Sequence, residues 1–533
     1  MYDLVIRNGR VVDGSGAPWF YADVAVAGGK IVAVGRLLSC EAKSTYDAQG
    51  KTVAPGFIDM HSHSDAPLLV NNRSESKVRQ GVTTEVIGNC GTSLGPVPKE
   101  KIAVISDQML REYRGAVVWD WSSMGEYLAR LERSGISVNV VPQVGHGTVR
   151  RVVMDYDNRP PTSRELQEMK DLIRSAMEDG VPGFSTGLTY TPSGYANTEE
   201  IIELAKVVAE YGGFYTNHMR NESDLLLGSV TETIRIGEEA GLPAHIVHLK
   251  ATGRHNWGKS LDALELVDRA RARGVDVTCD QYPYHALSTG LGALMPPWAA
   301  AGGRHEFLAR LGDASTRARM REEIEQGTPD WASYCKGVGW DNVMVARCSP
   351  SPAAEGRTIG ELAQEAGKDA FDYAFDILKS SDLNVGVIVF AMSEDDVARV
   401  MAHPVVMPGS DGSGLAPYGL LGRGVPHPRN YGTFARVLGH FVREKKVMRL
   451  EEAVRKMTSL PAARAGITGR GLLKPGFWAD VTVFDPATIA DAATFTKPHQ
   501  YARGIDWVFV NGELVVDHES HTGRTPGRVL RRK

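Results

Sequence analysis

The 533-residue sequence lacks several features that would set it apart from an ordinary enzyme-sized globular chain. It has no run of about 18 apolar residues, so we expect no transmembrane helix and no membrane partner. Residues 1–7 lack the apolar centre of a secretory signal, which predicts a cytoplasmic protein. Its five cysteines are scattered and never form a C-x-x-C pair, which argues against a disulfide framework and leaves each as a candidate ligand or nucleophile. With 60 Lys+Arg against 64 Asp+Glu and no strong charge block, nucleic acid is not expected as a partner.

The sequence has the composition of a well-packed protein, with 42% hydrophobic and 23% charged residues. Its two ends resemble each other, because each carries short apolar segments around an Asn-Gly pair, Asn8-Gly9 and Asn511-Gly512. Asn-Gly between alternating apolar residues is the strongest short-range hairpin signal. We therefore predict one small β-sandwich domain built from both termini, residues 1–55 and 466–533.

The region between the ends alternates between short apolar strands and amphipathic helices, with expected helices at 164–178, 198–210, 223–240 and 260–273. The expected strands number eight: 56–59, 84–88, 137–141, 183–186, 213–216, 244–248, 276–279 and 405–407. This pattern predicts an α/β fold, a (β/α)8 TIM-type barrel over residues 56–465. Residues 285–350 interrupt the alternation and are predicted to form an insertion after strand seven.

Potential metal ligands follow five of these strands, at the ends where barrel enzymes place their chemistry. His61 and His63 follow the first strand, and two residues apart they can face one pocket. Alone, such a pair is more often incidental. The other candidates also have structural explanations: Cys90 as a small buried residue, His218 and His248 as core histidines, and Asp411 as a turn or helix cap. Together, imidazole, thiolate and carboxylate suit zinc. The other candidate ligands are Cys90, His218, His248 and Asp411.

These segments resemble the amidohydrolase superfamily and, within it, the N-acyl-D-amino-acid deacylase (D-aminoacylase) family. The resemblance runs in family order through APGFIDMHSH, QGVTT with GNCG, GFSTGL, NHMR, VHLK, GSDG and KPGFWAD, at residues 54–63, 80–84, 88–91, 183–188, 217–220, 247–250, 409–412 and 474–480. Histidines spaced as in H-x-H mark only the superfamily, whereas the cysteine is the more specific signal. The resemblance implies a zinc-dependent enzyme that cleaves small N-acyl-D-amino acids to a carboxylate and a free D-amino acid.

Carried onto this sequence, the resemblance implies one tight zinc site formed by Cys90, His218 and His248. A second, weaker site would use His61, His63 and Asp411. Asp411 would act as general base towards metal-activated water and then as general acid towards the leaving amine. Lys250 and Tyr282 resemble residues that hold the substrate carboxylate, with Arg423 or Arg429 as weaker candidates. The sequence specifies no oligomeric state.

Three alternatives remain at this level. A cyclic amidase of the hydantoinase or dihydroorotase type shares the scaffold but usually has a carboxylated lysine on the fourth strand, and residues 182–192 contain no lysine. A serine hydrolase is suggested by the G-x-S-x-G pattern at 183–187, which would require a sharp strand-to-helix turn and acid and histidine partners. A non-catalytic barrel serving as a binding or scaffold protein should have lost ligands that this chain keeps.

Overall fold

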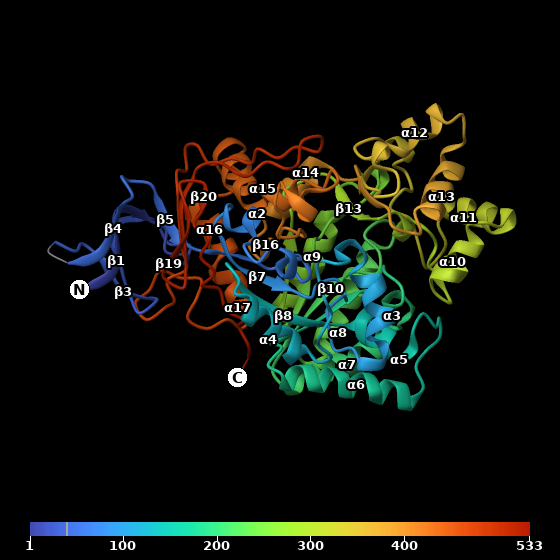
Figure 1. Ribbon diagram of the computed structural model, residues 1–533, viewed down its shortest axis with the longest axis horizontal. Helices are drawn as coiled ribbons and strands as arrows, with labels where there is room; N and C mark the ends of the chain where they lie inside the picture. The colour runs from blue at the N-terminus through green and yellow to red at the C-terminus, as the bar shows by residue number, and fades with distance from the viewer. Residues whose placement is uncertain (39–40, 533) are drawn as a thin grey trace.

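The computed structural model describes residues 1–38 and 41–532, and its centre is a barrel of eight parallel strands (Figure 1). Its first and last strands are joined by a parallel bridge between Ser62 and Gly412 and by the Asp411 N–H, which donates to the His61 carbonyl at 2.9 Å. The predicted (β/α)8 barrel is therefore confirmed. In sheet order the strands are β6 (Phe57–Asp59), β7 (Val82–Ile87), β8 (Asn139–Gly145), β9 (Gly183–Gly187), β10 (Phe214–His218), β11 (Ala244–Ile246), β12 (Val277–Gln281) and β16 (Val406–Pro408).

Helices cover the outside of the barrel, and the four predicted from periodicity are present within a few residues. They begin where the sequence supplies caps: the Thr162 hydroxyl and the Glu165 carboxylate form a reciprocal capping box at the start of α6. The same helix buries Met169 and Ile173 against the barrel. The covering helices include α4 (Met124–Ser134), α5 (His146–Met154), α6 (Ser163–Glu178), α7 (Thr198–Glu210), α8 (Leu226–Ala240), α9 (Lys259–Ala272), α14 (Glu394–Ala402), α15 (Arg429–Arg436) and α16 (Leu450–Met457).

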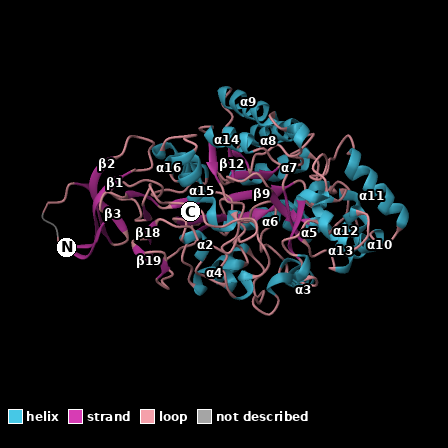
Figure 2. Ribbon diagram, turned by 90° about the horizontal axis from the view of Figure 1, so that it is seen from above, coloured by secondary structure: helices cyan, strands magenta, loops and turns pink. Residues whose placement is uncertain are grey.

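Both chain ends contribute to the small β domain, which lies at one end of the barrel (Figures 1 and 2). Its nine strands form one hydrogen-bonded sheet, in which β5 and β17 join the N-terminal to the C-terminal strands. A bridge between Lys30 and Trp478 brings the β3 edge back towards β17, so the sheet curls around one apolar core that includes Val24 and Phe509. The strands are β1 (Tyr2–Val11), β2 (Phe20–Ala27), β3 (Lys30–Gly35), β4 (Ala42–Asp47), β5 (Thr52–Pro55), β17 (Val481–Phe484), β18 (Ile505–Val510), β19 (Glu513–Asp517) and β20 (Ser520–His521).

The two Asn-Gly pairs have different structures. Asn511-Gly512 forms the predicted hairpin between β18 and β19. Asn8-Gly9 does not, because β1 runs through it and the pairing with β2 shifts register there as a bulge. Asn8 has φ +54°, and its N–H donates to the Asp23 carboxylate at 2.9 Å. A primed turn and a bulge of this kind both place a residue at positive φ, so the dipeptide alone does not distinguish them.

An inserted subdomain with its own apolar core lies at the opposite end of the barrel (Figure 2). Its sheet contains β13 (Leu287–Gly290), β14 (Val343–Arg347) and β15 (Gly386–Val389), and its helices are α10 (Arg304–Arg310), α11 (Ala314–Gln326), α12 (Ile359–Glu365) and α13 (Ala370–Ser380). Because β15 pairs with both β13 and β14, the inserted core extends to Ala391, beyond the expected end at residue 350. Helices α12 and α13 have the same periodicity as barrel helices, so the sequence offered no boundary.

The last residues of the chain leave the small domain and run along the barrel. Isolated parallel bridges join Pro526 to Ile136 and Val529 to Val140, and the Arg531 guanidinium donates to the Asp179 carbonyl at 3.1 Å. Across the described residues, no helix combines the length and apolarity required to span a bilayer.

A buried charge cluster stabilises the closure between β6 and β16. The Lys77 ammonium is fully buried and lies 2.7 Å from Asp59 Oδ2, 2.5 Å from Ser410 Oγ and 3.1 Å from the Gly412 carbonyl. The Asp59 carboxylate also accepts from the backbone N–H groups of His61 and Ser410. One ion pair therefore connects the two segments that carry His61 and Asp411.

We expect Lys77→Met to lower the free energy of unfolding by about 3–5 kcal/mol, because it leaves a buried carboxylate without its counter-ion. Chemical denaturation followed by tryptophan fluorescence measures this loss. Lys43→Met is the matched control, since the Lys43–Asp3 pair is largely exposed and should contribute less than about 1 kcal/mol. Equal losses in the two variants would contradict a structural role for the buried cluster.

Candidate metal centre

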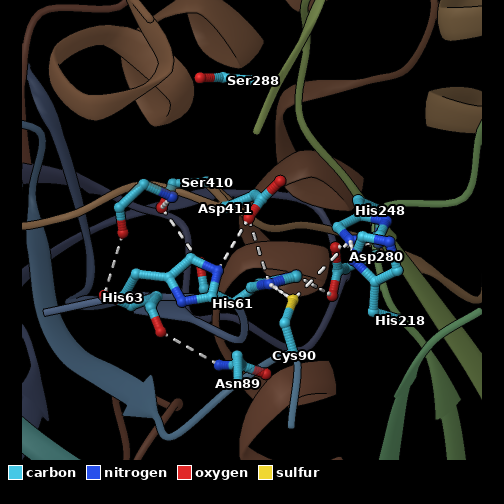
Figure 3. A network of polar contacts seen from close by, with 12 residues as sticks. His61, His63, Asn89, Cys90, His218, His248, Asp280, Ser288, Ser410 and Asp411 are labelled. Atoms are coloured by element: carbon cyan, nitrogen blue, oxygen red, sulfur yellow. Dashed lines mark hydrogen bonds and ion pairs between the residues drawn. The ribbon is translucent and has the colours of Figure 1, made fainter. Parts of the chain in front are cut away.

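The six candidate ligands, which lie far apart in the sequence, come together in one buried site at the carboxyl ends of the barrel strands (Figure 3). They form two groups, and within each group the potential ligand atoms lie within 4.8 Å of one another. One group contains Cys90, His218 and His248, and the other contains His61, His63, Cys90 and Asp411. The Cys90 sulfur therefore belongs to both groups.

Three of these residues have an unusual backbone conformation. Cys90, His248 and Asp411 have φ values of +53°, +39° and +49°. Non-glycine residues with positive φ are costly and cluster at functional sites. Close packing around Cys90 maintains this geometry: a Cβ on Gly187 of β9 would lie only 2.2 Å from the Cys90 carbonyl. The strained turns direct side chains at strand ends into the site.

The distances between donor atoms suit a divalent cation with a soft ligand. Cys90 Sγ lies 3.3 Å from His61 Nε2 and 3.9 Å from His248 Nε2, which is itself 2.7 Å from His218 Nδ1. The outer nitrogens face other polar groups: His218 Nε2 faces Tyr334, and His248 Nδ1 faces Glu222 and the Lys250 ammonium. A cation bound by both inner nitrogens would make their close approach favourable. The residues therefore fit a metal ion.

The site also supplies anionic donors. Burial alone would raise the pKa of Cys90, but the positive charges of protonated His61 and His63 hold it well below its ordinary value, which favours the thiolate. Burial likewise raises the pKa of Asp411, and the charges of Arg429 and His61 outweigh this effect and keep its pKa well below the usual range. Arg429 Nη1 lies 2.8 Å from Asp411 Oδ2.

Two buried carboxylates orient the candidate ligands from behind. Asp280 Oδ1 accepts from the backbone N–H of His248 at 2.8 Å, while Oδ2 lies 2.9 Å from His245 Nε2 and 3.5 Å from His61 Nδ1. Glu222 Oε1 lies 2.7 Å from His248 Nδ1. Carboxylates that accept from the outer nitrogen of a ligating histidine are typical of metal sites.

The comparisons with known proteins agree with this geometry. The model of the "Amidohydrolase family" matches residues 44–516. The chain belongs to the amidohydrolase family. It is 38% identical to a D-aminoacylase of Alcaligenes xylosoxydans xylosoxydans over 531 residues, covering 100% of this chain and 98% of the relative. An N-acyl-D-glutamate deacylase of the same organism is 37% identical, over 99% of this amidohydrolase and 96% of the relative. The resemblance to the D-aminoacylases is thus confirmed.

Solved structures similar to this amidohydrolase contain metal. The N-acyl-D-glutamate deacylase of Bordetella bronchiseptica, complexed with zinc and a phosphonate mimic of the tetrahedral intermediate, superimposes with a TM-score of 0.83, 37% identity and 99% coverage of both chains. A D-aminoacylase structure with the same score and identity, covering 100% of both chains, is described as binuclear, with one-metal activation and second-metal attenuation. A D-hydantoinase, at 16% identity and a TM-score of 0.56, shares the fold alone.

Three of the predicted substrate-binding residues in this amidohydrolase lie beside the ligands. The Tyr282 ring is buried, with Arg429 Cζ 4.9 Å and Lys250 Nζ 5.6 Å from its centre. None of the described residues hydrogen-bonds the Tyr282 hydroxyl. Lys250 already pairs with Glu222 at 2.6 Å. Arg423 is exposed on the wall of a cavity of about 240 Å³ that Arg429, His63 and Asp411 also line.

The serine pattern at 183–187 does not form a nucleophile elbow. Ser185 is buried within β9, where its hydroxyl donates to the Gly88 carbonyl at 2.5 Å and accepts from the Gly91 N–H. Its hydrogen-bond partners within the described chain include no histidine.

Sequence reasoning missed Asp280 and Glu222 as parts of the site. Both are buried carboxylates, one within a short apolar strand and one four residues after His218. An acidic residue in an apolar strand near strand-end histidines could have indicated this role, because burying an unpaired charge is costly and such a carboxylate therefore needs a partner.

Proposed function

We propose that this amidohydrolase hydrolyses N-acyl-D-amino acids to a carboxylate and a free D-amino acid, with zinc as its metal. The observation that carries the proposal is the cysteine shared by both donor groups, in a chain 38% identical over its full length to a D-aminoacylase. In the cyclic amidases a carboxylated lysine on the fourth strand usually bridges the two metal sites, and β9 contains no lysine. The D configuration is inferred from the similarity to D-aminoacylase and to the D-glutamate and D-aspartate deacylases.

Cys90, His218 and His248 would hold the tightly bound zinc, because thiolate and imidazole are the donors that zinc prefers. His61, His63 and Asp411, together with Cys90, would form the weaker second site. Bound zinc lowers the pKa of water towards neutrality and polarises an amide carbonyl.

Asp411 is the group best placed to move the proton. Its Oδ1 lies 3.3 Å from His61 Nε2 and 3.1 Å from His63 Nε2, inside the donor cluster. Because its carboxylate is ionised at neutral pH, it can accept a proton from the attacking water and then donate it to the departing amine nitrogen. Arg429 and Tyr282 present a cation and a hydroxyl on the same side, and with Lys250 they would bind the α-carboxylate.

The cavity beside the site favours an apolar substrate side chain. Tyr190, whose ring lies 4.7 Å from that of His218, lines a cavity of about 540 Å³ together with Met295 and Phe307. The guanidinium groups on its wall, Arg111 and Arg304, are both paired with Asp382. A carboxylate-bearing side chain would therefore find no uncommitted cation among these wall residues.

The test is hydrolysis of paired N-acetyl-D- and N-acetyl-L-Met, Leu and Glu by zinc-loaded protein, with a chelator-treated sample as control. We expect turnover of the D forms only, faster for Met and Leu than for Glu, and lost in the chelated sample. Turnover of hydantoins or dihydroorotate in place of every N-acetyl amino acid would overturn the proposal and indicate a cyclic amidase.

A further inference from the structure

A short segment of the inserted subdomain, residues 332–336 (the docking segment), binds the loop after β10 beside the metal centre. The Asn221 amide donates to the Ala332 carbonyl at 3.0 Å, and the Lys336 ammonium lies 2.7 Å from Asp224 Oδ2. Between these two anchors lies Tyr334. The segment is also tied to the inserted subdomain, since the Ser333 hydroxyl donates to the Leu294 carbonyl and both Tyr334 and Cys335 pack in the inserted core.

Tyr334 reaches the candidate ligands directly. Its hydroxyl donates to Glu222 Oε2 at 3.1 Å and lies 3.2 Å from His218 Nε2, and its side chain is buried at 5% residue exposure. Glu222 uses its other oxygen, Oε1, to contact His248 Nδ1 at 2.7 Å. One carboxylate therefore contacts one histidine directly and the other through the phenol.

The phenol contact determines which nitrogen of the His218 ring carries the proton. Because the Tyr334 proton goes to Glu222, the phenol oxygen can only accept from His218 Nε2–H, which leaves the lone pair on Nδ1. His248 Nδ1 faces both Glu222 Oε1, which can only accept, and the Lys250 ammonium, which can only donate, each at 2.7 Å, so a metal ion on Nε2 requires Nδ1–H to donate to Glu222. His218 Nδ1 lies 2.7 Å from His248 Nε2, and both nitrogens face Cys90.

We propose that Tyr334 is a positioning residue of the metal centre: its hydroxyl relays Glu222 to His218 and thereby fixes the tautomer and orientation of that histidine. The inference rests on the proposed function only in taking His218 and His248 as metal ligands. Since Tyr334 belongs to the insertion, docking of the inserted subdomain completes the metal centre. The barrel holds its metal at full affinity only with this segment in place.

Tyr334→Phe removes the hydroxyl and keeps the ring. The expected result is a loss of zinc affinity of about 10–100-fold, as is typical when an outer hydrogen bond to a ligating histidine is lost. Competition with a chelating dye measures the affinity, and the absorption spectrum of cobalt-substituted protein should shift because His218 is no longer held. Metal-free protein should unfold at nearly the same temperature as the parent. Tyr373→Phe is the matched control: Tyr373 packs on the same inserted core and has no hydrogen bond to residues 218–224 in the described chain.

A double-mutant cycle with Glu222→Ala isolates the relay, because alanine leaves no acceptor for the Tyr334 hydroxyl. Since Tyr334 acts through Glu222, adding Tyr334→Phe to Glu222→Ala should lower zinc affinity by much less than it does in the parent. Unchanged affinity and an unchanged cobalt spectrum in Tyr334→Phe would overturn the inference, as would full additivity. These readouts do not depend on turnover, so a parent enzyme that binds zinc but fails to cleave N-acyl-D-amino acids would refute the proposed function alone.

Discussion

Asp411→Asn is expected to lower kcat by about 10²–10⁴-fold, the range that a positioned general acid–base supplies. Asparagine has nearly the same size and keeps one oxygen near His61 and His63, but it cannot accept the proton from water. The contacts around the side chain should therefore survive while the chemistry is lost. Steady-state hydrolysis of N-acetyl-D-Met, measured at saturating substrate, gives the change in kcat.

The experiment needs two companion measurements. Zinc content must be determined for the variant, because Cys90, His218 and His248 remain and should still bind one tightly held ion. Asp395→Asn, on the exposed first turn of α14, is the matched control and should behave as the parent. A variant with full zinc and undiminished kcat would show that another group transfers the proton, even if the substrate class is correct.

The barrel and its candidate ligands could be predicted because both depend on local sequence. A parallel strand buried on both sides gives a short apolar run, and barrel chemistry lies where such runs end. Each of these residues ends or closely follows a strand, so their convergence followed from the fold without knowledge of any contact: His61, Cys90, His218, His248 and Asp411. The hairpin predicted at Asn8-Gly9 was wrong because local sequence was not enough there: a bulge of this kind and a hairpin place the same local demand on the backbone.

The outer contacts could not be predicted, because they depend on where distant segments dock. Tyr334 lies more than a hundred residues from His218, in an insertion whose sequence contains no signal for barrel contact. Lys77 joins the first and last barrel strands through Asp59 and Ser410, a contact that exists only once the barrel closes. The sequence therefore indicated the donor atoms, whereas their tautomers and orientations required the assembled fold.

Cys90→Ala is expected to abolish tight zinc binding. It should also lower kcat/KM by more than about 10²-fold, since the substrate's amide carbonyl would lose the zinc ion that polarises it. The substitution removes the one donor common to both groups, so neither site retains a thiolate. Loss of zinc should also lower the stability of the folded protein. A ligand present at about 1,000 times its Kd stabilises the folded protein by about 4.1 kcal/mol. A chelator should therefore lower the Tm of the parent and leave that of Cys90→Ala unchanged.

Cys279→Ala is the control that separates ligand loss from packing loss. Cys279 is even more deeply buried than Cys90 and lies in barrel strand β12, but burial and the nearby Asp280 raise its pKa far above its ordinary value, so it remains a thiol. Its removal should cost packing energy while zinc content, activity and the chelator effect on Tm persist. If both variants lost zinc equally, the metal would depend on the integrity of the barrel core and not on the thiolate. If Cys90→Ala kept its zinc, the histidines and Asp411 would suffice as ligands. The distinction from the lysine-bridged amidases would then no longer rest on this cysteine.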